Sequence, residues 1–242
     1  MKKLSVFLSF LLLLSVFAGA DIYIKSKTHT DAFQMMGQNQ PAKDETSEQW
    51  LGDDKFATIT TNFTIIMDMK KNMLYWVNNE NKTYVESPLP FELTNIIDPQ
   101  MAKMMEGMMK MTVTAAPNGQ TKTVGQWKCT GYDVSLNMAM MPLKMTVWAS
   151  TDVPFDVDKF TKFQTNVLKA TMRLDDAAVE EMKKVKGYWI ATELNADIMG
   201  AKMHNTTEVI EISKKSPPAS VYTVPADYTK KDKLSMQEFQ QR

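Results

Sequence analysis

Residues 63–86 read FTIIMDMKKNMLYWVNNENKTYVE, and this stretch carries the pattern that decides the fold. It contains three runs rich in β-branched, aromatic and other apolar residues, which are typical of β-strands. Short polar connections rich in Asn separate three such runs, as in hairpin turns. The stretch therefore predicts a meander of three strands, at 63–69, 73–78 and 82–86.

The middle strand of this meander carries large apolar groups on both sides. Leu74 and Trp76 would point to one face of the sheet, and Tyr75 and Val77 would point to the other. A strand with one solvated face would instead alternate apolar and polar residues. We therefore expect a sheet that is covered in part on each face.

Strand patterns also dominate the rest of the chain. Pro117-Asn118-Gly119 has the composition of a turn between two strands. After Pro217-Pro218, residues 221–228 are expected to return along an edge of the sheet. The other predicted strands are 21–29, 49–61, 111–115, 121–124, 127–137, 143–151, 188–198 and 202–214.

Helical patterns interrupt the strands in two places. Asp98 is a good N-cap and Pro99 suits the first helical position, so a helix should follow them. Two more helices are expected, one between 158 and 172 and one that Asp175 caps and Gly187 ends. The order of strands, helix, strands, helical insert and strands predicts an α+β fold with mainly antiparallel pairing around one curved sheet.

The N-terminus has the pattern of a cleavable secretory signal peptide over residues 1–20. Lys2 and Lys3 precede a short apolar run that small residues close at Ala20. The run is too short to span a bilayer, which takes ~20 apolar residues, and no later segment is long enough. Since Asp21 rather than Cys follows, no lipid anchor is expected and the mature protein would be periplasmic or secreted. We expect one domain over 21–230 and a flexible polar tail over 231–242.

Composition narrows the class of partner. The chain has 28 basic and 28 acidic residues, whereas a nucleic-acid binder carries a basic excess or stripe, so no nucleic-acid partner is expected. The single cysteine, Cys129, leaves no internal disulfide. A buried inert thiol is expected there, with reactivity or intermolecular pairing as the alternative. The count that asks for an explanation is 21 methionines.

Many of these methionines gather on one face of the helix predicted after Asp98. They could fill gaps in ordinary helix-to-sheet packing, form an adaptable wall for apolar ligands, or bind Cu(I) through their thioethers. Copper sites of this kind often include His, and neither His29 nor His204 sits in a ligand-spaced motif. We predict no metal and no cofactor. The helical spacing joins Met101, Met104, Met105, Met108 and Met109.

Nothing in the sequence indicates catalysis. It contains no Gly-x-Ser-x-Gly, no phosphate-binding glycine loop and no His-Glu-x-x-His. Paired carboxylates such as Asp53-Asp54 are common on protein surfaces. We therefore predict that the protein is not an enzyme.

Several motifs, in this order, resemble those of a known family. They are Phe63-Thr-Ile-Ile-Met-Asp68, Lys82-Thr-Tyr84, Gly125-Gln-Trp-Lys-Cys-Thr-Gly-Tyr132, Val147-Trp-Ala-Ser-Thr-Asp152, Thr207-Glu-Val-Ile-Glu-Ile212 and Pro225-Ala-Asp-Tyr228. The chain resembles the bacterial exported family of domain of unknown function 4412, which is similar to periplasmic lipoprotein carriers of the LolA-like kind. That resemblance implies an open half-barrel, a strongly bent sheet with helices against its concave face and an apolar cavity for acyl chains. It implies no catalytic residues.

These observations predict an exported, non-enzymatic protein that holds a lipid or an acylated protein between curved sheet and helices. An envelope interaction module with a self-filled core is one alternative, and a methionine-based copper-binding protein is another. The expected wall of the ligand site is Met101, Met104, Met105, Met108, Met109, Phe160 and Phe163.

Overall fold

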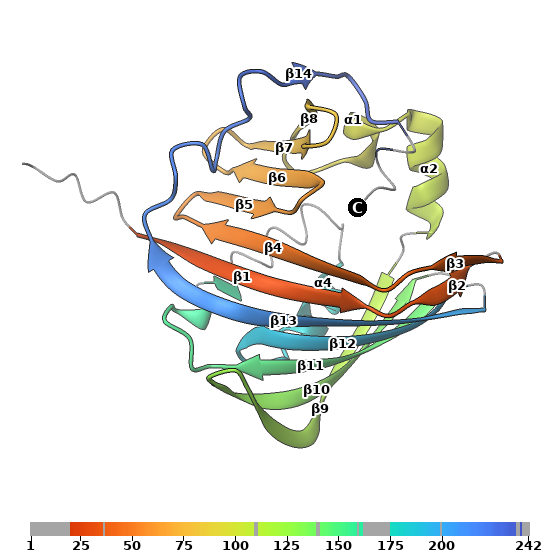
Figure 1. Cartoon of the computed structure of the whole chain (residues 1–242), viewed down its shortest axis with the longest axis vertical. Coiled ribbons are helices and arrows are strands. Elements are labelled where there is room, and N and C mark those ends of the chain that lie inside the picture. The colour runs from red at the N-terminus through yellow and green to blue at the C-terminus, as the bar shows by residue number, and fades with distance from the viewer. Residues whose placement is uncertain are drawn as a thin grey trace, which may run out of the picture.

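Figure 1 shows the protein as a computed structural model. The structure describes residues 20–35, 37–108, 111–138, 141–158, 160–161, 175–198, 200–235 and 238. Its elements are β1 (Asp21–Thr30), β2 (Phe33–Met35), β3 (Gln38–Gln40), β4 (Lys43–Leu51), β5 (Lys55–Ile59), β6 (Phe63–Asp68), β7 (Met73–Asn78), β8 (Thr83–Pro88), α1 (Leu93–Ile96), α2 (Pro99–Met108), β9 (Met111–Val124), β10 (Trp127–Met138), β11 (Met141–Ser150), α4 (Asp176–Met182), β12 (Tyr188–Ile198), β13 (Ala201–Lys215) and β14 (Thr229–Lys230).

The prediction of an α+β fold is wrong. Strands take up 57% and helices 12% of the residues that the structure describes, so the fold is mostly β. The helices α1, α2 and α4 have 4, 10 and 7 residues. Together α1 and α2 cover one patch of the sheet and α4 covers another, so they do not form a helical layer. The helix predicted between 158 and 172 lies mostly outside the described residues.

The other two predicted helices begin where expected, but one ends early. Asp98 accepts the backbone N–H of Gln100 at 2.8 Å and so caps α2. Asp175 accepts the N–H of Ala178 at 2.7 Å and so caps α4. The helix α4 already ends at Met182, because the next hydrogen bonds tighten into a turn. Gly187 therefore does not end the helix; a Cβ there would lie 2.6 Å from the Ser150 carbonyl.

The main sheet has 12 strands in the order β14-β8-β7-β6-β5-β4-β1-β13-β12-β11-β10-β9. Two antiparallel meanders, β4–β8 and β9–β13, form its upper and lower parts in Figure 1. The strand β1 joins them, because it pairs antiparallel with β4 on one side and with β13 on the other. Since the order begins at β14 and ends at β9, the sheet is open. The short hairpin of β2 and β3 forms a separate two-stranded sheet that packs beside β13.

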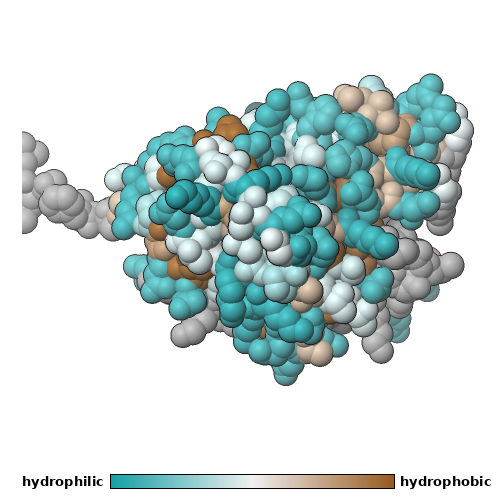
Figure 2. All heavy atoms as spheres, turned by 90° about the horizontal axis from the view of Figure 1, so that it is seen from below, coloured by the Kyte–Doolittle hydropathy of each residue, from teal (hydrophilic) through white to brown (hydrophobic). Residues whose placement is uncertain are grey.

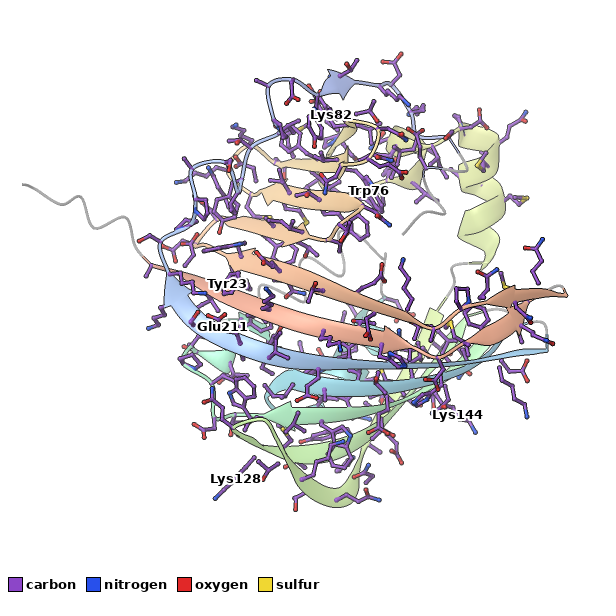
Figure 3. All side chains as sticks on the ribbon, viewed as in Figure 1. Tyr23, Trp76, Lys82, Lys128, Lys144 and Glu211 are labelled. Carbon is purple, nitrogen blue, oxygen red and sulfur yellow. The ribbon has the colours of Figure 1, made fainter. Side chains whose placement is uncertain are left out.

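The register of these pairs decides which side chains share a face. Ile24 on β1 lies opposite Ile212 on β13. Alternation along each strand then places Trp76 of β7, labelled in Figure 3, and Val147 of β11 on the same face as Ile24. We call this the helix face.

The helices cover the two ends of the helix face. Over β6–β8, the helices α1 and α2 bury Ile96, Ile97 and Ala102 completely. Over β9–β11, α4 buries Ala178 and Val179. Each helix thus contributes a small apolar cluster to a core that consists mainly of strand side chains.

The C-terminal segment covers the opposite face of β1 and β4–β8. Val221 packs there with Tyr23 and Trp50, whose ring centroids lie 4.7 Å apart. The chain then pairs β14 with β8 in parallel and turns around that edge to the helix face. Leu234 is 4% exposed in the α1–α2 cluster, and its N–H donates to the Ile96 carbonyl at 2.6 Å. Part of the predicted tail is therefore packed on the fold.

Most predicted strands lie close to observed ones, and the differences have physical causes. The predicted strand 49–61 is two strands, because Gly52-Asp53-Asp54 turns the chain between β4 and β5. Residues 221–228 cross a face of the sheet, and the edge is taken by β14.

Pro117-Asn118-Gly119 does not separate two strands. Both halves belong to β9, and residues 118–120 form a bulge at a register shift opposite β10. Asn118 lies over Gly131, where a Cβ would come within 2.4 Å of the Asn118 Oδ1. A side chain at position 131 would therefore require the Asn118 side chain to move.

Candidate functional site

A cleft of about 650 Å³ opens where β1 begins and where β4 and β13 end. This volume is that of a small-molecule site, roughly 300–1,000 Å³. Ile22 and Leu51 line it from paired positions on β1 and β4. Both lie on the helix face, because Ile22 is two residues from Ile24. Phe155 and Phe160 line it from the segment after β11.

Three aromatic rings fix the apolar floor of this cleft. The centroids of Phe155 and Phe160 lie 5.3 Å apart, and Tyr188 meets both rings edge-on at 5.5 and 5.0 Å. Such edge-to-face pairs contribute about 0.5–1.5 kcal/mol each beyond area burial. Tyr188 is 7% exposed, and burial raises the pKa of its hydroxyl. The floor is thus built from rings that hold one another in place.

The mouth of the cleft is charged. Lys70 lies 2.6 Å from Asp54, and this hydrogen-bonded ion pair lowers the pKa of the Asp54 carboxyl. Tyr222 donates its hydroxyl to Asp21 at 2.5 Å, and burial together with this bond raises the pKa of Tyr222. Lys214 also lines the mouth. An apolar floor under a rim of both charges fits an amphiphilic molecule.

The structure brings together some of the residues predicted for the ligand site. Phe160 lines the cleft. Met101 packs against the α1–α2 cluster, and Phe56 packs against both that cluster and the one that contains Phe160. Through Phe56, the predicted residues Met101 and Phe160 therefore lie in one continuous apolar layer.

The remaining predicted residues are placed less completely. Met104 is 56% exposed on α2, so its side chain is available at the surface. For Met105 and Met108 the structure describes only the backbone, within α2. Met109 and Phe163 lie outside the described residues.

Four residues of this region were not predicted from the sequence, namely Ile22, Leu51, Phe155 and Tyr188. They come from four separate segments and converge only after β1 has paired with β4 and β13. No local motif could have revealed them. The one usable signal was Phe155, an aromatic residue in a stretch of aspartates, valines and a proline over 152–158.

A protein-family model covers most of the sheet. The model of the family described as Domain of unknown function (DUF4412) matches residues 25–228. The chain belongs to this family. In this DUF4412 chain the match runs from within β1 to the residue before β14. No curated protein matches the chain. Because the family description names no activity, function has to be argued from the cleft.

A second groove of about 680 Å³ lies on the opposite face of this DUF4412 chain, and ion pairs line its walls. Lys122 pairs with Glu193 at 3.0 Å and lies over the Trp148 ring at 4.1 Å. His29 bonds Asp44 through Nδ1 at 2.7 Å, and this bond raises the pKa of His29. The Lys122–Glu193 and His29–Asp44 pairs already satisfy these charges, so the charges are less available to a ligand.

The described residues give no geometry for a metal, and Cys129 is buried. In the described part of the chain, no group of three or more His, Cys, Asp or Glu side chains could hold a metal ion.

Cys129 is 2% exposed, and burial raises the pKa of its thiol. Across the same part, no helix is both long and apolar enough to cross a membrane.

Proposed function

We propose that this DUF4412 protein is an exported binding protein without catalytic activity, which holds the acyl chain of a lipid or of an acylated protein. The observation that carries the proposal is the cleft in which Phe155 and Phe160 form an apolar floor under a charged rim. An amphiphile would lay its chain on the rings and leave its polar end at the mouth. Water would be displaced from the floor and would still reach the rim.

Burial of the chain would supply the affinity. Removing ~200 Å² of acyl surface from water contributes ~5 kcal/mol at ~25 cal/mol per Å². Association itself costs ~4 kcal/mol or more. The chain alone would therefore bind weakly, and micromolar binding, about −8 kcal/mol, needs a longer buried chain or contacts between the polar end and the rim.

Export rests on the predicted signal peptide, and the start of β1 supports the position of its cleavage. Asp21 is the first residue of β1 and pairs with Lys215 on β13. Cleavage before Asp21 would thus remove no residue of the sheet. Intact-mass measurement of the protein recovered from the periplasm or the medium should give a chain that starts at Asp21. A chain that retains residues 1–20 in the cytoplasm would contradict export.

The direct test of ligand binding uses natively purified mature protein. Organic extraction followed by mass spectrometry should release lipid, and a fluorescent fatty acid should bind and be displaced by unlabelled fatty acid. An empty extract together with no probe binding would refute the proposal.

Matched variants test whether the ligand lies in the cleft. Phe160→Ala removes one ring of the floor, and we expect about tenfold weaker probe binding, or about 1.4 kcal/mol. Phe33→Ala is the control, because Phe33 is a half-exposed Phe on β2, in the separate hairpin. Equal losses in both variants would mean that the cleft is not the site.

One observation favours the second candidate, an envelope interaction module with a self-filled core. The space between α1, α2 and the sheet is occupied by the protein's own side chains, with Ile96, Ile97 and Ala102 fully buried. In that case the extract would be empty and the probe would not bind, whereas a protein partner would be recovered by crosslinking in the envelope.

A further inference from the structure

An open sheet has two edges whose backbone groups can pair with another strand. One edge of this sheet is β9, and at the other edge β8 carries the short strand β14. Both edges contain a proline, which lacks a backbone N–H. The two edges differ in what covers the rest of their backbone.

A side chain occupies the β9 edge. The backbone N–H of Ala115 faces away from β10 and donates to Glu181 Oε2 at 3.0 Å. Two residues further, on the same outward side, Pro117 has no N–H to offer. Beyond it, residues 118–120 leave the ladder in the bulge described above.

The fold holds Glu181 in this position. The helix α4 is fixed against β9–β11 by Ala178 and Val179, which are 2% and 3% exposed. Lys184, in the turn that follows the helix, forms an ion pair with Glu181. The Lys184 contact and the Ala115 N–H lower the pKa of Glu181, so its carboxylate is charged at neutral pH.

The β8 edge is covered by backbone instead. Thr229 and Lys231 donate their N–H groups to the carbonyls of Lys82 and Tyr84 at 2.9 and 2.8 Å. Uncovering that edge would require displacement of a whole segment. At β9, replacement of one side chain is enough to free a strand N–H.

We propose that Glu181 is a blocking residue, which keeps the β9 edge from pairing with a second copy of this chain. Its carboxylate takes the N–H that an incoming strand would need, and it places a negative charge where that strand would lie. A like edge from a second copy would bring a second Glu181 to the same interface, so the two charges would repel. The surface at this end of the molecule is largely hydrophilic, as Figure 2 shows, so backbone pairing rather than apolar contact would be the route to association.

The test compares Glu181→Ala with Glu180→Ala. Both variants remove one carboxylate and one ion pair to the lysine three residues on, but Glu180 is 68% exposed and its carboxylate pairs with Lys183. In sedimentation velocity over rising concentration, Glu181→Ala should shift toward twice the monomer mass while Glu180→Ala behaves as wild type. Glu181→Gln keeps an acceptor oxygen and should associate less than Glu181→Ala.

Pro117→Thr keeps the test decisive if Glu181→Ala does not fold. It returns an N–H to the same edge without touching α4, and we expect it to associate as well. Hydrogen exchange should then show protection of residues 111–117 in the associated form. If folded Glu181→Ala and Pro117→Thr both sediment as wild type at every concentration, or if wild type already pairs through this edge, the proposal is wrong.

Discussion

Leu234 is the residue through which the C-terminal segment holds α1 and α2 on the sheet. Its side chain is 4% exposed among Ile96, Ile97 and Leu93, and its backbone N–H bonds the Ile96 carbonyl. Leu→Ala substitutions in well-packed cores cost about 2.7–5.0 kcal/mol, depending on how far the site collapses. Leu234 follows the last strand and its segment can relax, so we expect about 2–3 kcal/mol for Leu234→Ala.

Urea unfolding of the mature protein measures this loss. With a denaturant slope of roughly 2–3 kcal/mol per M, the midpoint should fall by about 1 M. Ile210→Ala is the control, because it removes the same number of carbons from a side chain that is 52% exposed. The free energy of unfolding of Ile210→Ala should stay within about 0.5 kcal/mol of that of wild type. If Leu234→Ala unfolds with the wild-type midpoint, the C-terminal segment does not stabilise α1 and α2, and the reasoning fails.

Two further predictions concern ionisable groups. Burial opposes ionisation of Glu238, but Lys231 at 2.7 Å and the bonds to Ser235 outweigh it and hold its pKa at about 2, below the ordinary 4.5. The Glu238 carboxylate therefore stabilises the fold above pH 4.5 and loses its contribution as the pH falls toward about 2. The urea midpoints of wild type and Glu238→Gln should converge over that range. A constant difference between the two midpoints would contradict the ion pair. Cys129 is 2% exposed and its thiol pKa is raised by burial, so a thiol reagent should label it only in denaturant, and rapid labelling of the native protein would show that it is accessible.

The strands could be predicted because their signal is local. The three apolar runs and the Asn-rich turns of 63–86 give β6, β7 and β8 within one or two residues, and the caps Asp98 and Asp175 mark both helix starts. The turn at Gly52 was missed because apolar and aromatic residues flank it on both sides. The bulge at 118–120 was mistaken for a turn because a bulge uses the same residues.

The class and the site could not be predicted, because both depend on pairing between distant segments. The predicted α+β class treated two helical patterns as a layer of the fold. The helices that they form, α2 and α4, have only 10 and 7 residues beside a 12-stranded sheet. The cleft floor needs Ile22, Leu51 and Phe155, which meet only in the folded sheet. The packing of Leu234 was not predicted, because a single apolar residue in a polar stretch forms no periodic pattern.

The place of β1 has a consequence for how the chain folds. Its partner β13 lies near the other end of the sequence, with Asp21 opposite Lys215. Each meander can assemble from neighbouring strands, but the junction between them closes only when both ends of the chain are present. Contacts of such long sequence separation slow folding, because the loop must be ordered before they form. On a ribosome, β1 has no β13 until residue 215 has been made. If the protein is exported, as proposed, this delay leaves the chain time to cross a membrane before it folds.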